Sequence, residues 1–350
     1  MTDVKIIQVL DGGLFTTVQD AGRYGYQRYG VPVSGAMDGA ALRAANALVG
    51  NEAGAGALEI TVLGPTLQFL APATIALAGA DLGALAGDSP VVPWESITVA
   101  AGTVLSFTGP RDGIRAYLAV AGGLDVPVVL GSRSTYARSR LGGFEGRPLQ
   151  AGDVLRVLGT HPVADLVAAG LGAPARREVA PALRPRYGHR HLLRVVLGPQ
   201  EDRFTEAGIS TLLTHTYAVT GQSDRMGYRL QGPKIEHCAG PDIVSDGSPL
   251  GGVQVAGDGM PIVLMCDRGT AGGYTKIATV ITVDVWRLAQ AAAGDEVRFE
   301  AIGVEAAHEA VRDYDEWARQ VAGVSGTADL ARKRKAAAAV AAVGRYLTRG

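Results

Sequence analysis

The chain has little of several residue types, and each shortage excludes a class of protein. Only two of its 350 residues are cysteines, Cys238 and Cys266, so a disulfide framework is excluded and we expect two reduced, buried thiols. No apolar run approaches the ~20 residues that a membrane-spanning helix needs, and the N-terminal residues lack the pattern of a signal peptide. The formal net charge of −1 does not favour nucleic acid or an anionic membrane as a partner. We therefore expect a cytoplasmic protein that binds neither nucleic acid nor membranes.

Several catalytic motifs are also missing. The sequence contains no G-x-x-x-x-G-K-[ST] phosphate loop, no G-x-G-x-x-G after a strand and no G-x-S-x-G turn. Its six histidines include no H-E-x-x-H motif, and only His189 and His191 are close enough along the chain to share a ligand. A metal site needs three or four ligands, so the sequence predicts no metal site. No lysine lies between two methionines, so we expect no biotin attached to this chain.

Glycine, in contrast, is abundant. There are 48 glycines, about double the usual share of ~7%. Short β-branched runs such as "ATIALAGA" at 73–80 recur between Gly, Pro and Asp residues, and each has the length of a strand. Residues 37–51, "MDGAALRAANALVGN", instead have apolar side chains at helical spacing. The pattern predicts a mainly β fold with one clear helix in its first half.

The chain is divided by a segment rich in proline, alanine and arginine, which is typical of a linker. Similar stretches lie on either side of it: "VPVSGAMDGAAL" at 31–42 resembles "AVTGQSDRMGYRL" at 218–230. This similarity indicates two related β units, although glycine-rich turns can also look alike by chance. The expected divisions are a first β unit over 1–160, a linker over 161–190, a second β unit over 191–303 and a helical tail over 304–350.

Lysine is rare, and one lysine stands in a position that suggests a function. Lys and Arg together number 33, but only five of these residues are lysines. Lys276 follows a glycine pair in a predicted strand, where its compact ammonium could bind an oxyanion. The alternative is a lysine that protects a sheet edge from pairing.

Two glycine-rich loops precede this lysine, at 245–259 and 267–273. Unhindered backbone N–H groups in such loops can hold anions, although ordinary β-turns are the alternative. Ser34 and Asp38, either of which could cap the helix, are also expected to contact substrate. The expected substrate-binding residues are Gln254, Asp246, Gly251, Gly252, Gly272, Gly273, Ser34 and Asp38.

Opposite charges stand side by side in "GQSDRMGYRL", at Asp224 and Arg225. Neighbours on a strand point to opposite faces, so one of the two should face inward and need a partner. A local ion pair in a turn is the alternative. We expect Lys276, Asp224 and Arg225 to be catalytic and to converge on one cleft with the glycine loops.

Several long motifs resemble those of one family. They include residues 13–51, residues 114–136 and "SDGSPLGGVQVAGDGMPIVLMCDRGTAGGYTKIATVI" at 245–281. Together they resemble the KipA family, also called allophanate hydrolase subunit 2, the C component of 5-oxoprolinase or the biotin-dependent carboxyltransferase family. The resemblance covers about residues 5–302.

The resemblance implies tandem cyclophilin-like β-barrels, followed here by the helical tail. It also implies two partner proteins, one KipI-like (the B component) and one LamB/YcsF-like (the A component). Together the three would form an ATP-dependent 5-oxoprolinase that opens 5-oxo-L-proline to L-glutamate, is active only as a complex and shares its ATP site with a partner. Two alternatives are the carboxyltransferase component of a urea-carboxylase-like biotin enzyme and a non-catalytic KipA-type antagonist of a KipI-like histidine-kinase inhibitor. The lack of any biotin carrier segment in this chain favours the oxoprolinase.

Overall fold

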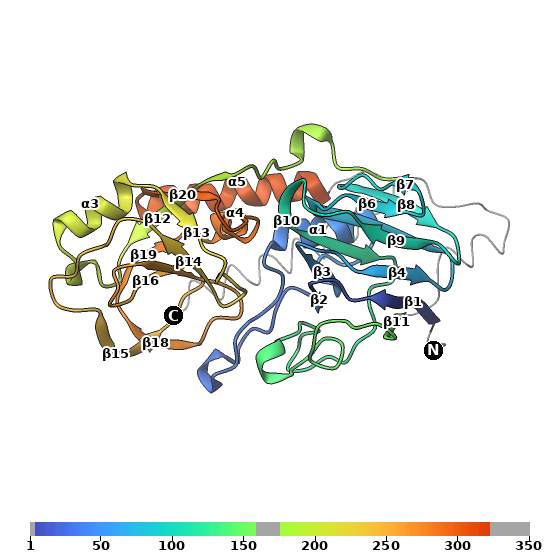
Figure 1. The fold of residues 1–350 in the computed structure, drawn as a ribbon, viewed down its shortest axis with the longest axis horizontal. Coiled ribbons are helices and arrows are strands. Elements are labelled where there is room, and N and C mark those ends of the chain that lie inside the picture. Colours follow the sequence, from blue (N-terminus) through green and yellow to red (C-terminus); the bar gives the residue numbers. More distant parts are fainter. Residues whose placement is uncertain (1–3, 159–175, 323–350) are drawn as a thin grey trace.

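The computed structural model describes residues 4–158 and 176–322, which form two β units side by side (Figure 1). The strands of the first unit end at Val157, and those of the second run from Arg190 to Ala301. The prediction of a mainly β chain is confirmed. Within these two ranges no helix is long and apolar enough to cross a membrane.

The first unit consists of two sheets that enclose one apolar core. Its core side chains come from both sheets, for example Ile7 and Phe69 from one and Leu58 and Leu118 from the other. The six-stranded sheet has the order β11 (Val154–Val157), β1 (Val4–Asp11), β4 (Thr66–Phe69), β9 (Val104–Phe107), β6 (Ala84–Ala86) and β7 (Ser89–Pro90). The five-stranded sheet has the order β2 (Phe15–Gln19), β3 (Ala57–Thr61), β10 (Asp112–Val120), β5 (Ala73–Asp81) and β8 (Glu95–Val99).

The second unit is a closed seven-stranded barrel. Its side chains alternate as a half-buried strand requires: in β20, Val297 and Phe299 are buried while their neighbours are exposed. Strands β12 and β20 close it in parallel, and the other neighbours are antiparallel. The order is β12 (Arg190–Leu197), β19 (Lys276–Val280), β16 (Gly252–Val255), β17 (Pro261–Leu264), β14 (Gly227–Gln231), β13 (Tyr217–Val219) and β20 (Glu296–Ala301).

A separate two-stranded sheet lies beside the barrel. It pairs β15 (Asp242–Gly247) with β18 (Ala271–Tyr274), and it is at the lower edge of the molecule in Figure 1. The shorter elements of this unit are η4 (Glu201–Arg203), α3 (Glu206–Thr214), η5 (Thr282–Asp284) and α4 (Val285–Ala289).

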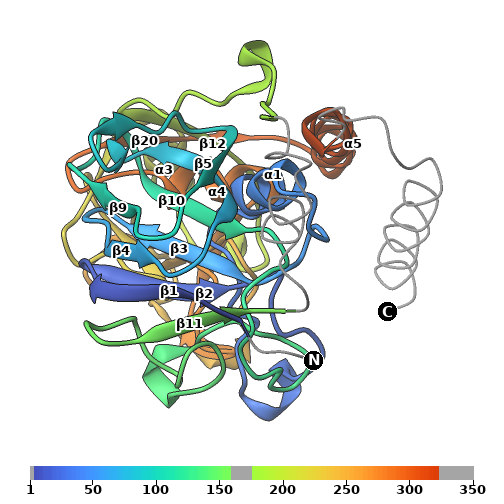
Figure 2. The same cartoon turned by 90° about the vertical axis from the view of Figure 1, so that its right-hand side faces the viewer.

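Helices join the two units on the opposite side. Helix α1 (Gly39–Leu48) packs on β5 and β10, and α5 (Val304–Ala322) lies beside it (Figure 2). Helix α5 also contacts η5 of the barrel. The Arg43 Nη2 donates to the Tyr314 hydroxyl at 2.6 Å, which fixes α5 to α1. The first unit also has the short turns η1 (Gln27–Tyr29) and η2 (Ala137–Ser139), and η3 (Pro181–Leu183) lies in the connection between the units.

Several local expectations can be compared with these elements. The helix predicted within 37–51 is confirmed as α1, and the predicted tail helix begins at Val304. Residues 161–175 of the predicted linker, the last two residues of the predicted first unit, and the tail beyond residue 322 lie outside the described residues. The expectation of two buried thiols is wrong for one of them: Cys266 is buried, but Cys238 is exposed. The internal repeat of the two units stays a prediction.

Candidate functional site

Lys276 is the first residue of β19, and its side chain is only 1% exposed. Its ammonium lies 3.1 Å from the Asp246 carboxylate, whose side chain is 53% exposed. Despite this ion pair, no hydrogen-bond acceptor within the described ranges is aligned with the Lys276 Nζ. A buried ammonium is costly without full hydrogen bonding, so this group is prepared to accept a further anion.

The barrel ladder and the β15–β18 sheet bring four other predicted residues near this lysine. Gln254 pairs with Lys276 in the barrel ladder, and Asp246 pairs with Gly272 in the two-stranded sheet. A Cβ at Gly272 would lie 2.8 Å from the Gln254 Nε2, so a larger residue there would force the end of the Gln254 side chain to move. The nearby Lys276 ammonium lowers the pKa of Asp246. We call these residues, with Gly273 beside Gly272 on β18, the Lys276 cluster: Lys276, Asp246, Gln254, Gly272 and Gly273.

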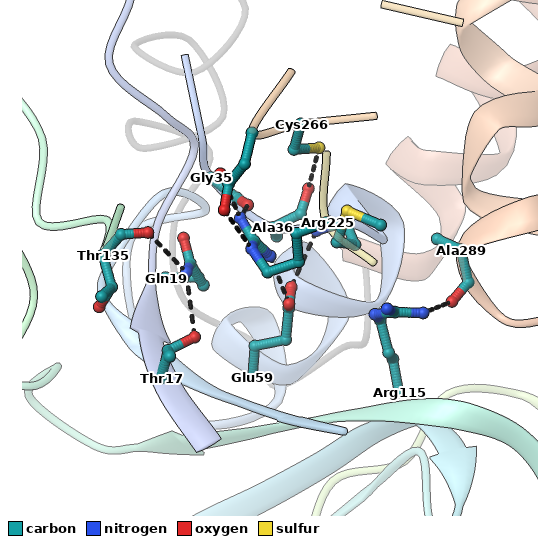
Figure 3. Close-up of polar contacts among 12 residues, drawn as sticks. Thr17, Gln19, Gly35, Ala36, Glu59, Arg115, Thr135, Arg225, Cys266 and Ala289 are labelled. Atoms are coloured by element: carbon teal, nitrogen blue, oxygen red, sulfur yellow. Dashed lines mark hydrogen bonds and ion pairs between the residues drawn. The ribbon is translucent and has the colours of Figure 1, made fainter. Parts of the chain in front are cut away.

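Arg225 lies in a different cluster, at the contact between the two units (Figure 3). Its Nε and Nη2 donate to the two carboxylate oxygens of Asp267, at 2.9 and 3.1 Å. Its Nη1 bonds to Glu59 of β3, and its Nη2 donates to the Gly35 carbonyl at 2.7 Å. Burial by itself would lower the pKa of Arg225, but the Asp267 and Glu59 carboxylates outweigh it and hold this pKa well above its usual range. Arg225 therefore stays charged and ties the barrel to the first unit.

Asp224 belongs to neither cluster. Its side chain is exposed and accepts hydrogen bonds from the backbone N–H groups of Met226 and Gly227, at 2.8 and 3.2 Å. Arg225 faces inward and Asp224 outward, as expected for one of the two, but both lie in the turn before β14 and not in a strand. The expectation that Lys276, Asp224 and Arg225 converge on one cleft is corrected by this geometry, because the Asp224 carboxylate is used to close its own turn.

Three other predicted residues have structural partners instead of a place in the Lys276 cluster. Gly251, at φ +79°, lies at the far end of β19, where a Cβ would meet the Val280 carbonyl at 2.6 Å. Gly252 follows it into the ladder opposite Thr279. Asp38 caps α1 by accepting from the Ala41 N–H at 3.0 Å, and burial raises its pKa. These contacts give the three residues structural roles, and substrate contact at their positions stays a prediction.

Ser34 differs from these three because it has an unused polar group. It holds a left-handed backbone conformation, φ 54°, which a residue with a side chain adopts only under constraint. Its N–H donates to the Cys266 carbonyl at 3.1 Å, but its buried hydroxyl has no partner among the residues that the structure describes. It stands next to Gly35, so it belongs with the Arg225 cluster.

Sequence reasoning missed two buried arginines on this side of the molecule. Arg23 donates to the carbonyls of Val129 and Ser134, at 3.0 and 2.8 Å, while its Nη1 finds no partner in residues 4–158 and 176–322. Burial lowers the pKa of Arg23, and the charges of Asp20 and Asp267 oppose that shift. Arg23 follows a glycine in "DAGRYG", and the second arginine, Arg268, precedes one in "CDRG". These glycine neighbours were the only signal in the sequence that pointed to either arginine.

The second missed arginine, Arg268, connects the two clusters. Its Nε donates to the Ser248 carbonyl at 2.7 Å, and a Cβ on Gly272 would lie 3.3 Å from the Ser248 hydroxyl. Arg268 also follows Asp267, the partner of Arg225. The Lys276 cluster and the Arg225 cluster are therefore parts of one polar region between the β15–β18 sheet and the first unit.

This region has the chemistry of an anion site. It combines several buried cations with three donors that lack an aligned acceptor within the described ranges: Arg23 Nη1, Ser34 Oγ and Lys276 Nζ. Such donors favour carboxylates, phosphates or a developing oxyanion. No group of three or more His, Cys, Asp or Glu side chains within the described part of the chain could hold a metal ion.

Comparison with known proteins adds a family to this geometry. The family model described as "Carboxyltransferase domain, subdomain A and B" matches residues 29–301, which include parts of both β units. The chain is 38% identical over 317 residues to the C component of 5-oxoprolinase from Escherichia coli (strain K12), a match that covers 91% of this chain and 98% of that protein. For the C component of 5-oxoprolinase from Haemophilus influenzae the values are 36% over 302 residues, with 86% and 93% covered.

A solved structure is similar over nearly the same range. The crystal structure of the Kluyveromyces lactis urea carboxylase matches with a TM-score of 0.83 at 32% identity. The match covers 94% of this chain but only 30% of that one. The fold is thus shared with one portion of a much longer protein.

Proposed function

Because this chain belongs to the carboxyltransferase family with subdomains A and B, we propose that it is the C component of a 5-oxoprolinase. In this proposal it acts with a KipI-like protein and a LamB/YcsF-like protein in the cytoplasm. The complex opens 5-oxo-L-proline to L-glutamate and hydrolyses ATP. The match over 98% of the length of the E. coli C component supports this choice.

The chemistry requires an anion site on this chain. A lactam is a poor electrophile, and transfer of the ATP γ-phosphoryl group to its oxygen would make the ring carbon open to attack by water. The C–N bond then breaks and the nitrogen takes a proton, which leaves an acyl phosphate. A second water hydrolyses this acyl phosphate to the glutamate side-chain carboxylate and free phosphate. Positioning and charge stabilisation supply most of the catalysis in such transfers. We propose that ATP is shared with a partner protein and that no biotin is attached here.

The observation that carries the proposal is the state of Lys276. Its buried ammonium has one carboxylate partner, which is itself half exposed, and no aligned acceptor among the described residues. A substrate carboxylate or phosphorylated oxygen would complete its hydrogen bonding. Asp246, beside it, could accept the lactam N–H, and the Gln254 amide could bind a carbonyl.

Carboxyl transfer is a second candidate, favoured by the TM-score of 0.83 to urea carboxylase. In that reaction the same Lys276 ammonium would hold the carboxylate that moves. The two candidates use one anion site but different substrates, so substrate choice separates them.

The test is reconstitution with the KipI-like and LamB/YcsF-like partners, followed by measurement of ADP and glutamate with 5-oxoproline or urea as substrate. We expect glutamate and ADP in equal amounts from 5-oxoproline only when all three proteins are present, and none from this chain alone. Turnover by the isolated chain would contradict the need for partners. ATP consumption driven by urea and bicarbonate with a biotinylated carrier would favour the second candidate instead.

A further inference from the structure

A second hollow lies away from the Lys276 cluster. Strand β19 begins at Lys276, and the chain continues from its other end into η5 and α4, which line a cavity of about 370 Å³. The remaining walls are the connecting segment at 182–186, Arg194 of β12 and helix α5. In Figure 1 α5 and the connecting segment run along the upper side, opposite the β15–β18 sheet. The two sites are therefore separate.

The charges around this cavity favour an anion. Four arginines line it, Arg184, Arg186, Arg194 and Arg287, against two acids, Asp284 and Asp313. The buried Asp284 carboxylate is already matched by Arg194, whose Nε and Nη2 donate to it at 2.8 and 2.7 Å. Arg287 reaches the same carboxylate only at 3.4 Å.

Arg186 is the cation that remains available. Its side chain is exposed, and no ion pair or hydrogen bond joins it to the described residues. Arg184, close to it in the chain, is directed to Glu95 and Glu178 at 3.2 and 3.0 Å. The cavity therefore has an unneutralised guanidinium at its rim, well suited to a phosphate group.

The same cavity has aromatic walls. Trp286, Tyr314 and Trp317 all line it, and each is partly exposed. The Arg287 guanidinium lies 4.7 Å from the centre of the Trp286 ring. Tyr314 and Trp317 contact each other with ring centres 5.5 Å apart. Flat apolar surface next to guanidinium groups fits a ligand with a planar ring and an anionic tail.

We infer that this cavity binds a nucleoside phosphate. The base would contact the aromatic side chains, and the phosphates would contact Arg186 and Arg287. The volume lies within the range of about 300–1,000 Å³ that is common for small-molecule sites. A ligand there would touch the connecting segment, the barrel and α5 together, so it would stabilise the arrangement of the two units. This goes beyond the proposed reaction, because the isolated chain should bind the ligand without catalysis.

The test is a titration of the full chain with ATP, followed by tryptophan fluorescence and by calorimetry. Two of the three tryptophans, Trp286 and Trp317, line the cavity, so binding should quench the emission. Adenosine and inorganic tripolyphosphate should each bind at least roughly tenfold more weakly than ATP, because each lacks one of the two contacts. Equal affinity for tripolyphosphate or for adenosine would overturn the assignment.

Three variants locate the binding. Arg186→Glu should weaken ATP binding by roughly tenfold or more, and Asp313→Asn should strengthen it by about two- to fivefold. Arg312→Glu is the matched control, because it reverses an exposed charge on α5 outside the cavity and should change affinity little. All three side chains are exposed, so folding should be kept. No quenching by millimolar ATP, or binding that Arg186→Glu leaves unchanged, would overturn the inference.

Discussion

Buried charge is the feature that most distinguishes individual residues of this protein. Arg225 and Glu59 are both almost fully buried, and each charged group has several hydrogen-bond partners. Besides its bond to Arg225, the Glu59 carboxylate accepts from the Met37 N–H at 2.8 Å and from the Tyr117 hydroxyl at 2.7 Å. Lys276 is equally buried but is met by a single carboxylate. A fully bonded charge fixes structure, whereas a partly bonded one is prepared for a ligand. This difference distinguishes an arginine whose hydrogen bonding is complete from a lysine that could still bind an anion.

The first prediction concerns Lys276. Lys276→Ala should lower turnover of the assembled complex by roughly a hundredfold or more, as loss of an oxyanion donor does in other enzymes. Lys276→Arg should be nearly as damaging, because a planar fork cannot replace a compact ammonium at the same distance. Turnover and assembly are measured on the reconstituted complex. Lys234→Ala, an exposed lysine of the same unit, should leave turnover unchanged, and a similar loss there would indicate a general effect of charge.

The second prediction concerns Arg225. Arg225→Ala would leave Glu59 and Asp267 buried without their cation, which should lower the free energy of unfolding by about 3–5 kcal/mol. The measurement is urea denaturation. Arg190→Ala is the control. It removes an ion pair with Glu296 in which the Arg190 side chain is 86% exposed, so it should lower the free energy of unfolding by less than about 1 kcal/mol. A small loss for Arg225→Ala would show that the cluster does not hold the units together.

At the scale of elements, helices fix the position of the two β units relative to each other. Helix α1 belongs to the first unit, yet the Asp38 carboxylate that caps it also accepts from the Gln290 Nε2 of the second unit at 2.9 Å. The Gln290 Oε1 in turn accepts from the Ile114 and Arg115 N–H groups, at 3.1 and 2.9 Å. One helix start thus depends on contacts between the units. Helix α5 then packs against α1 from the outside.

The third prediction tests the role of Asp38. Asp38→Ala removes both the helix cap and the Gln290 contact, so it should cost about 2 kcal/mol of stability. Asp38→Asn keeps a capping oxygen and should retain most of that stability. Neither change should alter the KM for 5-oxoproline in the reconstituted complex. A raised KM in the stable Asp38→Asn variant would support the sequence-based prediction that Asp38 contacts substrate.

At the scale of the whole molecule, the barrel closes where β12 meets β20. His191 of β12 has a side chain that is 3% exposed, and its Nε2 lies 3.4 Å from the Asp295 carboxylate just before β20. Burial lowers the pKa of His191 below its usual 6.5, although Asp295 acts in the opposite direction. Burial also lowers the pKa of His237. Burial therefore favours the neutral form of both histidines, and for His191 this burial results from closure of the barrel.

The fourth prediction follows from the sign of this shift. Below about pH 6.5 the unfolded chain takes up a proton at His191 and the folded chain does not. Stability is therefore fully present above pH 6.5 and declines as the pH falls toward the folded pKa, by at most about 1.4 kcal/mol per pH unit for one group. Unfolding measured between about pH 7.5 and 5.5 should show this decline, and His191→Gln should reduce it. The exposed His215→Gln should leave the slope unchanged, and an equal effect there would contradict the assignment.

The local patterns of the sequence were sufficient for much of the fold. The mainly β character and helix α1 follow from side-chain periodicity, and periodicity depends only on neighbours along the chain. The same reasoning predicted that one of Asp224 and Arg225 faces inward, and it selected Lys276 as a candidate, because residue type and the alternation of neighbouring side chains are local properties. It failed for Asp224 and Gly251, because a carboxylate can close a turn and a glycine can relieve a close contact without any ligand.

What the sequence by itself determined is therefore the class of fold, the family motifs and the need of one residue of the Asp224–Arg225 pair for a buried partner. Only the tertiary structure decided which residues meet: Arg225 finds Glu59 166 positions away and Asp267 42 positions away. It also divided the expected cleft into the Lys276 cluster and the Arg225 cluster, and it formed the aromatic cavity from four separate segments. The physical reason is that adjacent residues set the backbone preference of a segment. The energy of a buried charge depends instead on its distances to other groups in space, and these distances are fixed only when the chain folds.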